Sequence, residues 1–395
     1  MILPISPCNI RTELENIGVH TVGIALLLNK TEILPLKVLQ VRTPAANIIK
    51  QEMLGCGGDC AVHAEVITCQ QQYCDILLLG TRKHYAYLLK KLAMNPYFGL
   101  AKLCTELEAV LSPPLLYTQL ADGRKLTYQQ MVVMGILNIT PDSFYAGSRV
   151  SQVSTVLELA GRMLDEGATV LDVGGESSRP GADCVSPTEE IARVVPMLTA
   201  LRKEYPQSIL SIDTYHAATA QAAAEAGVDI INDISAGEAD TAMLDVVVKY
   251  KLPIILMHMR GTPKNMQQNV IYHNVVEEVT TYLNARATCL LNKGLGKDKV
   301  ILDPGIGFAK TVKHNLKLMQ GLNELTGLGY PILLAASRKS TIGQVLGALS
   351  TEERLEGTLA TSCQAVYAGA QMVRVHDVQA NVRAIRMLEA ILKCQ

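Results

Sequence analysis

Several residues with strong hydrogen-bonding side chains follow short apolar runs in this sequence. Two are carboxylates, Asp213 and Asp303, and the others are the amide of Asn232 and the amine of Lys339. A carboxylate accepts two parallel hydrogen bonds, and an amide offers both a donor and an acceptor. This combination suits the edge of a flat heterocycle such as an aminopyrimidinone, with the lysine facing a ring carbonyl. We therefore expect these residues to bind a planar ligand that carries N–H groups and carbonyls.

Cationic side chains at similar positions predict a second binding function. Arg374 and His376 lie at the end of the last apolar run, and Arg179 lies in the glycine-rich segment Gly174–Ala182. A guanidinium can bind two phosphate oxygens at once, and glycine lets the backbone approach a ligand closely. We therefore expect the rim of the site to hold a phosphate or pyrophosphate group.

Strand-like apolar runs alternate with helical segments from Met131 onward. The eight runs are Met131–Ile139, Val170–Val173, Ile209–Ile212, Asp229–Asn232, Ile254–Met257, Val300–Leu302, Ile332–Ala335 and Met372–Val375. The helical segments include Val153–Glu166, Pro187–Lys203, Ala217–Ala226, Val275–Asn292 and Thr358–Ala368. Strands that alternate with helices form a parallel sheet, and eight such units can close into a barrel. The sequence therefore predicts an α/β fold, a (β/α)8 TIM barrel.

The polar residues described above follow the carboxyl ends of these strands, which form the active face of such barrels. Any one of them could simply close its strand, but a partly desolvated set costs stability unless it binds a ligand. Asp172, inside the second run, has two interpretations, a core carboxylate satisfied by its neighbours or a part of the site. We expect His258 to be a core histidine, and Lys310 to orient the loop after the sixth strand.

The first part of the chain has an α+β pattern and lacks a recognisable chemical motif. Thr43–Leu54 is predicted to be a helix ended by Gly55, Asp75–Gly80 a buried strand and His84–Met94 a second helix. Tyr117–Gln130 contains a turn signal and is expected to be a connector.

We therefore predict two domains, a smaller N-terminal α+β domain of unknown role (residues 1–122) and the barrel (residues 123–395). Two roles stay open for the N-terminal domain, a packing or oligomerisation module and a small-ligand regulatory module. Four of its cysteines are close in sequence, Cys56, Cys60, Cys69 and Cys74, but their spacing differs from that of zinc fingers. We expect them to be buried thiols.

Composition excludes several classes of protein. The formal net charge is −1, so a general nucleic-acid surface is not expected. No apolar run approaches the roughly 20 residues of a membrane span, and the N-terminus does not have the pattern of a signal peptide. We expect a cytoplasmic protein that binds neither nucleic acid nor membrane.

The motifs at the strand ends resemble those of dihydropteroate synthase, a family of pterin-binding enzymes. MGILNITPDSF (Met134–Phe144) and GGESSRPGA (Gly174–Ala182) look like the two signature segments of that family. SIDT, IND, LDPGIGF, SRKS and RVHD match its remaining motifs in the same order. The resemblance extends from about Val132 to the end of the chain.

This resemblance implies a transferase of folate biosynthesis. Such enzymes join 6-hydroxymethyl-7,8-dihydropterin pyrophosphate to p-aminobenzoate and release 7,8-dihydropteroate and pyrophosphate, with Mg2+ as the cofactor. The resemblance also implies a sulfonamide target and a homodimer formed through the later helices of the barrel.

The resemblance assigns a role to each matching residue. It implies metal binding by Asn138 and pterin binding by Asp213, Asn232, Asp303 and Lys339. It implies pyrophosphate binding by Asn138, Arg179, Arg374 and His376. It implies p-aminobenzoate binding by Phe144, Ser178, Arg179, Pro180, Phe308 and Ser340. The residues expected to be catalytic are Asn138, Arg179, Lys339, Arg374 and His376.

Two positions depart from the family pattern. Many members have Asp-Gly-Gly after the phenylalanine of the first loop, whereas this chain has Ala146 at the place of the carboxylate. The change is expected to weaken that loop's contact with Mg2+. Ser178 stands where threonine is common, and it keeps the hydroxyl.

The expected mechanism needs no activated nucleophile, because an arylamine is neutral at pH 7 and has its lone pair available. We expect an SN1-like displacement in which cations stabilise the departing pyrophosphate and carboxylates favour the cation left on the pterin methylene. Loops bearing Phe144 and Arg179 would close over that cation and exclude water. Two alternatives are a methyltetrahydrofolate-type pterin methyltransferase, which would not need the arginine, lysine and histidine motifs, and a silent pterin-binding protein.

Overall fold

The computed structural model describes residues 2–68, 70–139, 149–176, 185–262, 264, 266–267 and 270–394, with the side chains of 149–152 left out. Internal contacts divide the chain into a first unit that ends at Pro114 and a second unit, Leu115–Leu392. Each unit has its own hydrophobic core. The two units are therefore described separately.

The second unit is a parallel eight-stranded barrel. Its strands are β6 (Val132–Asn138), β7 (Val170–Gly174), β8 (Ile209–Asp213), β9 (Ile230–Asp233), β10 (Ile254–Met257), β11 (Val300–Asp303), β12 (Leu333–Leu334) and β13 (Met372–Val375). They are ordered β11-β10-β9-β8-β7-β6-β13-β12, and a parallel bridge between Leu302 and Ile332 joins the two ends of the sheet. The predicted TIM barrel is confirmed.

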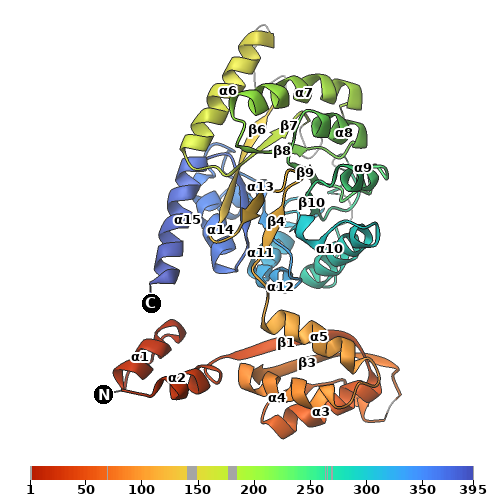
Figure 1. Ribbon diagram of the computed structural model, residues 1–395, viewed down its shortest axis with the longest axis vertical. Helices are drawn as coiled ribbons and strands as arrows, with labels where there is room; N and C mark the ends of the chain where they lie inside the picture. Colours follow the sequence, from red (N-terminus) through yellow and green to blue (C-terminus); the bar gives the residue numbers. More distant parts are fainter. Residues whose placement is uncertain are drawn as a thin grey trace. The chain divides into compact units, whose positions relative to one another are not determined.

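Helices surround the strands on the outside of the barrel (Figure 1). They are α6 (Arg149–Asp165), α7 (Pro187–Glu204), α8 (Ala217–Glu225), α9 (Met243–Tyr250), α10 (Val275–Asn292), the short η4 (Lys297–Lys299), α11 (Val312–Gln320), α12 (Leu322–Thr326), α13 (Ser340–Val345), α14 (Leu355–Tyr367) and α15 (Val378–Lys393). Side-chain caps define several starts. Ser186 accepts from the Glu189 amide at α7, and Asn274 accepts from the Glu277 amide at α10.

Alternating side chains along each strand build two separate apolar layers. On β7, Leu171 and Val173 point outward into the cluster shared with the helices, whereas Val170 points into the barrel. The inward residues at the amino ends of the strands form an apolar floor, which includes Met134, Val170, Ile230, Ile255, Ile301, Leu333 and Met372. On β7, β9, β11 and β13 the next inward residues, two positions further along, are polar, namely Asp172, Asn232, Asp303 and Arg374.

A β-hairpin closes the floor of the barrel. It consists of β4 (Tyr117–Gln119) and β5 (Lys125–Thr127), and its Leu120 and Leu126 are buried in the floor cluster. The expected connector Tyr117–Gln130 is therefore an ordered hairpin, because its apolar residues complete the barrel core. The hairpin belongs as a whole to the second unit, whereas a domain boundary after Asp122 would pass through its turn.

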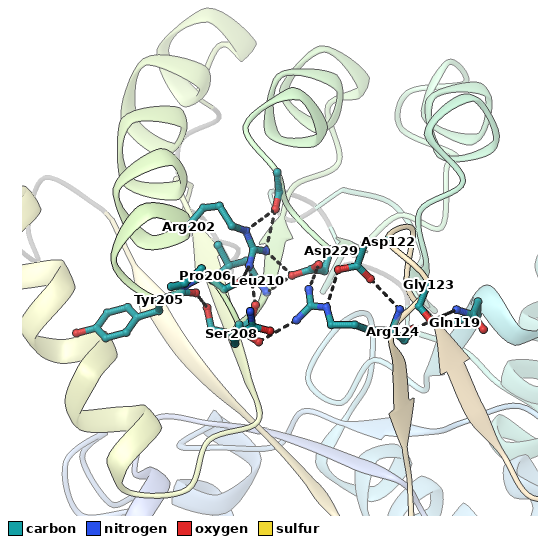
Figure 2. A network of polar contacts seen from close by, with 12 residues as sticks. Gln119, Asp122, Gly123, Arg124, Arg202, Tyr205, Pro206, Ser208, Leu210 and Asp229 are labelled. Carbon is teal, nitrogen blue, oxygen red and sulfur yellow. Dashed lines mark hydrogen bonds and ion pairs between the residues drawn. The ribbon is translucent and has the colours of Figure 1, made fainter.

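A buried carboxylate ties this hairpin to the barrel (Figure 2). Asp229 Oδ1 accepts from Arg124 Nη2 at 2.7 Å, and its Oδ2 accepts from Arg202 Nη2 at 2.5 Å. The Leu210 amide donates to Asp229 Oδ2 at 2.8 Å. Arg124 also pairs with Asp122 in the hairpin turn. One acid thus joins the hairpin, the end of α7 and strand β8.

The first unit has a three-stranded antiparallel sheet in the order β1-β3-β2. Its elements are η1 (Pro7–Asn9), α1 (Ile10–Asn16), α2 (Thr21–Leu28), β1 (Ile33–Arg42), α3 (Thr43–Cys56), β2 (Asp59–Ala61), η2 (Ala64–Val66), β3 (Tyr73–Thr81), α4 (Arg82–Ala93) and α5 (Leu100–Leu111). The smaller α+β domain is thus confirmed.

Helix α3 ends later than predicted, and two of the clustered cysteines are buried as expected. Helix α3 continues past Gly55 to Cys56, because Gly57, with φ +85°, provides the left-handed cap. Cys60 and Cys74 are buried free thiols, and Cys56 is half-buried and free. Burial raises the pKa of the Cys60 thiol to about 11. Among the described residues no group of His, Cys, Asp and Glu is arranged to hold a metal, and no helix is long and apolar enough to cross a membrane.

The Asp229 network predicts a large loss of stability when its charge is removed. Asp229→Asn leaves two arginines without their shared carboxylate and is expected to lower the free energy of unfolding by roughly 3 kcal/mol. Urea denaturation followed by circular dichroism measures this loss. The matched control is Asp245→Asn, which breaks the 2.6 Å ion pair between Asp245 and Lys293. The Asp245 side chain is 69% exposed and the Lys293 side chain is 41% exposed. The free energy of unfolding is expected to change far less in this control, because the exposed pair is solvated and screened, and equal losses in the two variants would contradict the prediction.

Candidate functional site

Three inward-facing residues meet at the carboxyl ends of β6, β7 and β8. Asn138 pairs in register with Gly174, which pairs with Asp213. A Cβ atom added to Gly174 would lie 3.6 Å from Asn138 Oδ1 and 3.9 Å from Asp213 Oδ2. The missing side chain of Gly174 therefore lets an amide and a carboxylate approach each other over one strand end.

An arginine occupies the centre of the barrel mouth between two acids. Arg374 Nε donates to Asp172 Oδ2 at 2.5 Å, and its Nη2 donates to Asp213 Oδ2 at 2.7 Å. Asn232 Nδ2 also donates to Asp172 Oδ2, at 3.1 Å. Burial disfavours a charged Arg374, but Asp172 and Asp213 outweigh this effect and raise its pKa. The guanidinium of Arg374, which was expected at the rim of the site, therefore lies among the acids.

Asp213 is strongly influenced by its environment. Burial raises its pKa to about 7, and the nearby Asp172 adds to the rise, although Arg374 opposes it. Asp213 therefore changes its protonation state near neutral pH. A carboxylate of this kind can accept N–H groups from a ligand once it is ionised.

Asp303 and Lys339 face the other side of the mouth. Asp303 is 3% exposed, and the Gly305 amide donates to its Oδ1 at 2.7 Å. Lys339 Nζ donates to the carbonyl of Ile306 and lies 4.6 Å from the centre of the Phe308 ring. Burial lowers the pKa of Lys339 to about 8, while Asp303 opposes the change. Burial also raises the pKa of Asp303, against the effect of Lys339.

The loop after β11 is held from below by a buried lysine. Lys310 Nζ donates to the carbonyls of Phe308 at 2.9 Å and His258 at 3.2 Å, and lies 2.9 Å from His258 Nδ1. Burial lowers the pKa of His258 to about 2, so the ring is neutral and Nδ1 can accept. Gly305, with φ +69°, packs so closely on the His258 carbonyl that a Cβ would lie 2.1 Å from that oxygen. Lys310 thus fixes the segment that presents Asp303 and Phe308.

Phe308 belongs to an apolar cluster at the mouth. Its partners are Ile234, Met257, Met259, Met266 and Ala309, with Tyr215 packed against them. These side chains form an apolar surface beside the polar groups, as binding sites for flat aromatic ligands require.

His376 and Ser340 lie toward the last two strand ends. His376 Nδ1 is 2.9 Å from Ser337 Oγ, which also accepts from the His376 amide at 3.2 Å. Ser340 is the exposed first residue of α13. The structure thus groups His376 with Ser337, and Arg374 with the acids further inside.

Part of the expected site lies outside the described residues. Phe144 and the neighbouring Ala146 are in the range 140–148, and Ser178, Arg179 and Pro180 are in 177–184. Asp172, for which the sequence allows two interpretations, contacts two expected site residues, Asn232 and Arg374. The signal was present in the spacing, because Asp172 lies two residues before Gly174 and so faces the same way.

The expected Mg2+ ion can be tested against its single assigned ligand. Asn138 ends β6 with an exposed side chain, and its Oδ1 lies over Gly174. Mg2+ prefers oxygen ligands and commonly takes one or two from the protein and the rest from substrate phosphates and water. Among the described residues, one amide oxygen at an open mouth fits such a substrate-dependent site.

The barrel region matches a known family of enzymes. Residues 134–376 match the family described as pterin binding enzyme. Dihydropteroate synthase of Synechocystis sp. is 43% identical over 287 residues, which are 72% of this chain and 98% of that protein. Dihydropteroate synthase of Bacillus subtilis is 44% identical over 268 residues, which are 68% of this chain and 91% of that protein.

Solved structures agree with this match. Yersinia pestis dihydropteroate synthase with a sulfonamide drug has a TM-score of 0.66 and 39% identity, covering 71% of this chain and 100% of that one. Xanthomonas albilineans dihydropteroate synthase in complex with 7,8-dihydropteroate has a TM-score of 0.63 and 34% identity, covering 71% and 100%. With a family match over most of the barrel and relatives aligned over nearly their whole length, this chain belongs to the dihydropteroate synthase family of pterin-binding enzymes.

Proposed function

We propose that this protein is a dihydropteroate synthase, a transferase that joins 6-hydroxymethyl-7,8-dihydropterin pyrophosphate to p-aminobenzoate in folate biosynthesis. The observation that carries the proposal is the composition of the barrel mouth, where Asp213, Asn232, Asp303 and Lys339 surround Arg374. Acceptors and donors of this kind match an aminopyrimidinone edge, and the cations match a pyrophosphate.

A single-turnover experiment tests this function directly. Excess purified protein is mixed with the pterin pyrophosphate, p-aminobenzoate and Mg2+, and dihydropteroate and pyrophosphate are measured over time. Formation of both products in equal amounts is expected, and a sulfonamide is expected to reduce it by competing with the arylamine. Tight pterin binding without either product would instead identify a silent pterin-binding protein.

The pterin is held by groups that accept and donate at fixed places. Asp213 and Asp303 accept N–H groups of the ring, Asn232 adds an amide, and Lys339 donates to a ring carbonyl. Asp303 is preorganised by the Gly305 amide, and Lys339 by the Ile306 carbonyl. Because these contacts exist before the ligand arrives, little of the binding energy is lost in ordering the site.

The departing pyrophosphate lies toward Asn138, Arg374 and His376. Asn138 would hold a Mg2+ ion through its side-chain oxygen, and such an ion would supply positive charge to the pyrophosphate oxygens. The guanidinium of Arg374 and the ring of His376 add donors on the protein side. Arg179 serves the same group in this proposal, and it lies outside the described residues.

The reaction itself is proposed to be a dissociative, SN1-like displacement. The C–O bond to pyrophosphate breaks first and leaves positive charge shared between the methylene carbon and the electron-rich dihydropterin. Ionised Asp213 and Asp303 favour that charge. The neutral arylamine then attacks with its lone pair beside Phe308 and Ser340, and loses a proton to give dihydropteroate.

We further propose that the enzyme is a homodimer. Three large apolar side chains on the last two helices support this arrangement, namely Tyr367 on α14 and Met387 and Ile391 on α15, which are 73%, 63% and 57% exposed. Light scattering during gel filtration measures the mass in solution.

Lys339→Ala is expected to weaken binding of the pterin pyrophosphate at least about tenfold, because a partly buried donor to the ring is lost. Isothermal titration calorimetry measures the dissociation constant. Lys317→Ala, at an exposed position of α11, is the matched control and should bind as the wild type does. Near-normal affinity of the Lys339 variant would remove Lys339 from the pterin site.

Binding of the bare dihydropterin is expected to depend on pH through Asp213. Its pKa of about 7 means that the carboxyl is mostly protonated at pH 6 and mostly ionised at pH 8. Since the ionised form accepts ring N–H groups, the affinity should rise by about tenfold over this range. Asp213→Asn should bind weakly at both values, with a flat profile. A wild-type affinity that falls as pH rises would contradict the assignment.

A further inference from the structure

Asp172 is a buried acid that the proposed mechanism does not use. It lies in the middle of β7 and has 0% exposed surface. Its Oδ2 accepts from both Asn232 Nδ2 and Arg374 Nε, at 3.1 Å and 2.5 Å. A charged group this deep is costly unless it is paired, so its two contacts need an explanation.

The first contact fixes the direction of an amide. The two ends of an asparagine side chain have nearly the same shape, so sterics alone do not decide which end faces a ligand. An ionised carboxylate can accept hydrogen bonds but cannot donate them. Asn232 must therefore turn its nitrogen toward Asp172, and its Oδ1 is directed away from that acid.

The second contact fixes the plane of a guanidinium. Arg374 is held by Nε on Asp172 and by Nη2 on Asp213. Two contacts from a planar group to two separate acids leave it little rotational freedom. Asp172 thus contacts one residue of the pterin set and one of the pyrophosphate set.

We propose that Asp172 is a positioning residue that sets the hydrogen-bond pattern read from the pterin. By holding the Asn232 nitrogen, it makes Asn232 Oδ1 an acceptor for a ring N–H group and selects against heterocycles that present a carbonyl there. Asp172 acts through Asn232 and Arg374, since it has no exposed surface with which to contact the substrate. This inference rests on the proposed function.

The test compares Asp172→Asn with the wild type. Asparagine has nearly the same shape but can both donate and accept, so the Asn232 amide is no longer held in one direction. We expect the dissociation constant of bare 6-hydroxymethyl-7,8-dihydropterin to rise at least about tenfold. The KM for p-aminobenzoate, with the pterin substrate saturating, should stay within about twofold, since no contact of Asp172 leads to Phe308 or Ser340 among the described residues.

Ser211→Ala is the matched control. Ser211 is fully buried and lies opposite Asp172 in register on β8. Its substitution by alanine removes a buried hydroxyl. It should bind the pterin as the wild type does. Equal rises of both constants in Asp172→Asn, or an unchanged pterin constant, would overturn the proposal.

A double-mutant cycle separates positioning from a general structural effect. Asn232→Ala should weaken pterin binding at least about tenfold in the wild type but less than about threefold in the Asp172→Asn background, because the oriented amide is already lost there. Equal factors in the two backgrounds would show that Asp172 does not act through Asn232.

A second background covers the case in which Asp172→Asn alone does not fold. Arg374→Met and Arg374→Met/Asp172→Asn are compared, because the double variant removes both partners of the Arg374–Asp172 ion pair. The added Asp172→Asn change should still weaken binding of the bare pterin, and no further weakening would refute the positioning role. The proposed function is tested separately by the wild type, whose failure to form dihydropteroate would be seen before any variant is compared.

Discussion

The compensation of buried charge is the constraint on which this barrel mouth depends. Three acids, Asp172, Asp213 and Asp303, lie inside the barrel with little or no contact with water. Such a set could not stay ionised without cations close by. Arg374 forms ion pairs with Asp172 and Asp213. Lys339 and Lys310 oppose the rise that burial causes in the pKa of Asp303. The compensation is incomplete at Asp213, because burial still raises its pKa to about 7.

The rest of the barrel unit supplies stability that compensates for the polar groups at this mouth. Below it, the inward residues at the amino ends of the strands are apolar, and Leu120 and Leu126 of the hairpin seal that floor. The hairpin is in turn anchored through Asp229, which accepts from Arg124 and Arg202. Apolar burial therefore supplies stability at one end of the barrel, while the other end carries the groups that bind.

Much of this arrangement could be predicted from the sequence. Continuous apolar runs predicted all eight strands, because strands of a parallel barrel are buried on both faces. The positions of Asn138, Asp213 and Asn232 at the carboxyl ends of these strands then predicted that they share one mouth of the barrel. The hairpin was missed because its short strands gain their stability from the barrel floor, and a connector with a turn signal looks the same in sequence.

The partners of individual side chains could not be predicted. Arg374 is 202 positions from Asp172 and 161 from Asp213, so their contacts depend on barrel closure and not on local pattern. Lys310 likewise bonds to His258, which is 52 positions away. The chemical type of each residue can be read from the sequence. The pairing of opposite charges depends on how the sheet closes.

The central position of Arg374 has a consequence for the order of events. Nη2 of Arg374 donates to Oδ2 of Asp213, the acid proposed to bind the pterin. A pterin that donates one N–H group to each oxygen of Asp213 competes with Arg374 for Oδ2. Its arrival would therefore loosen that contact, while the bond from Nε to the fully buried Asp172 keeps the guanidinium in place. The donor released in this way lies beside the pterin and can turn toward its pyrophosphate, so binding of the ring would itself prepare the cation that the leaving group requires.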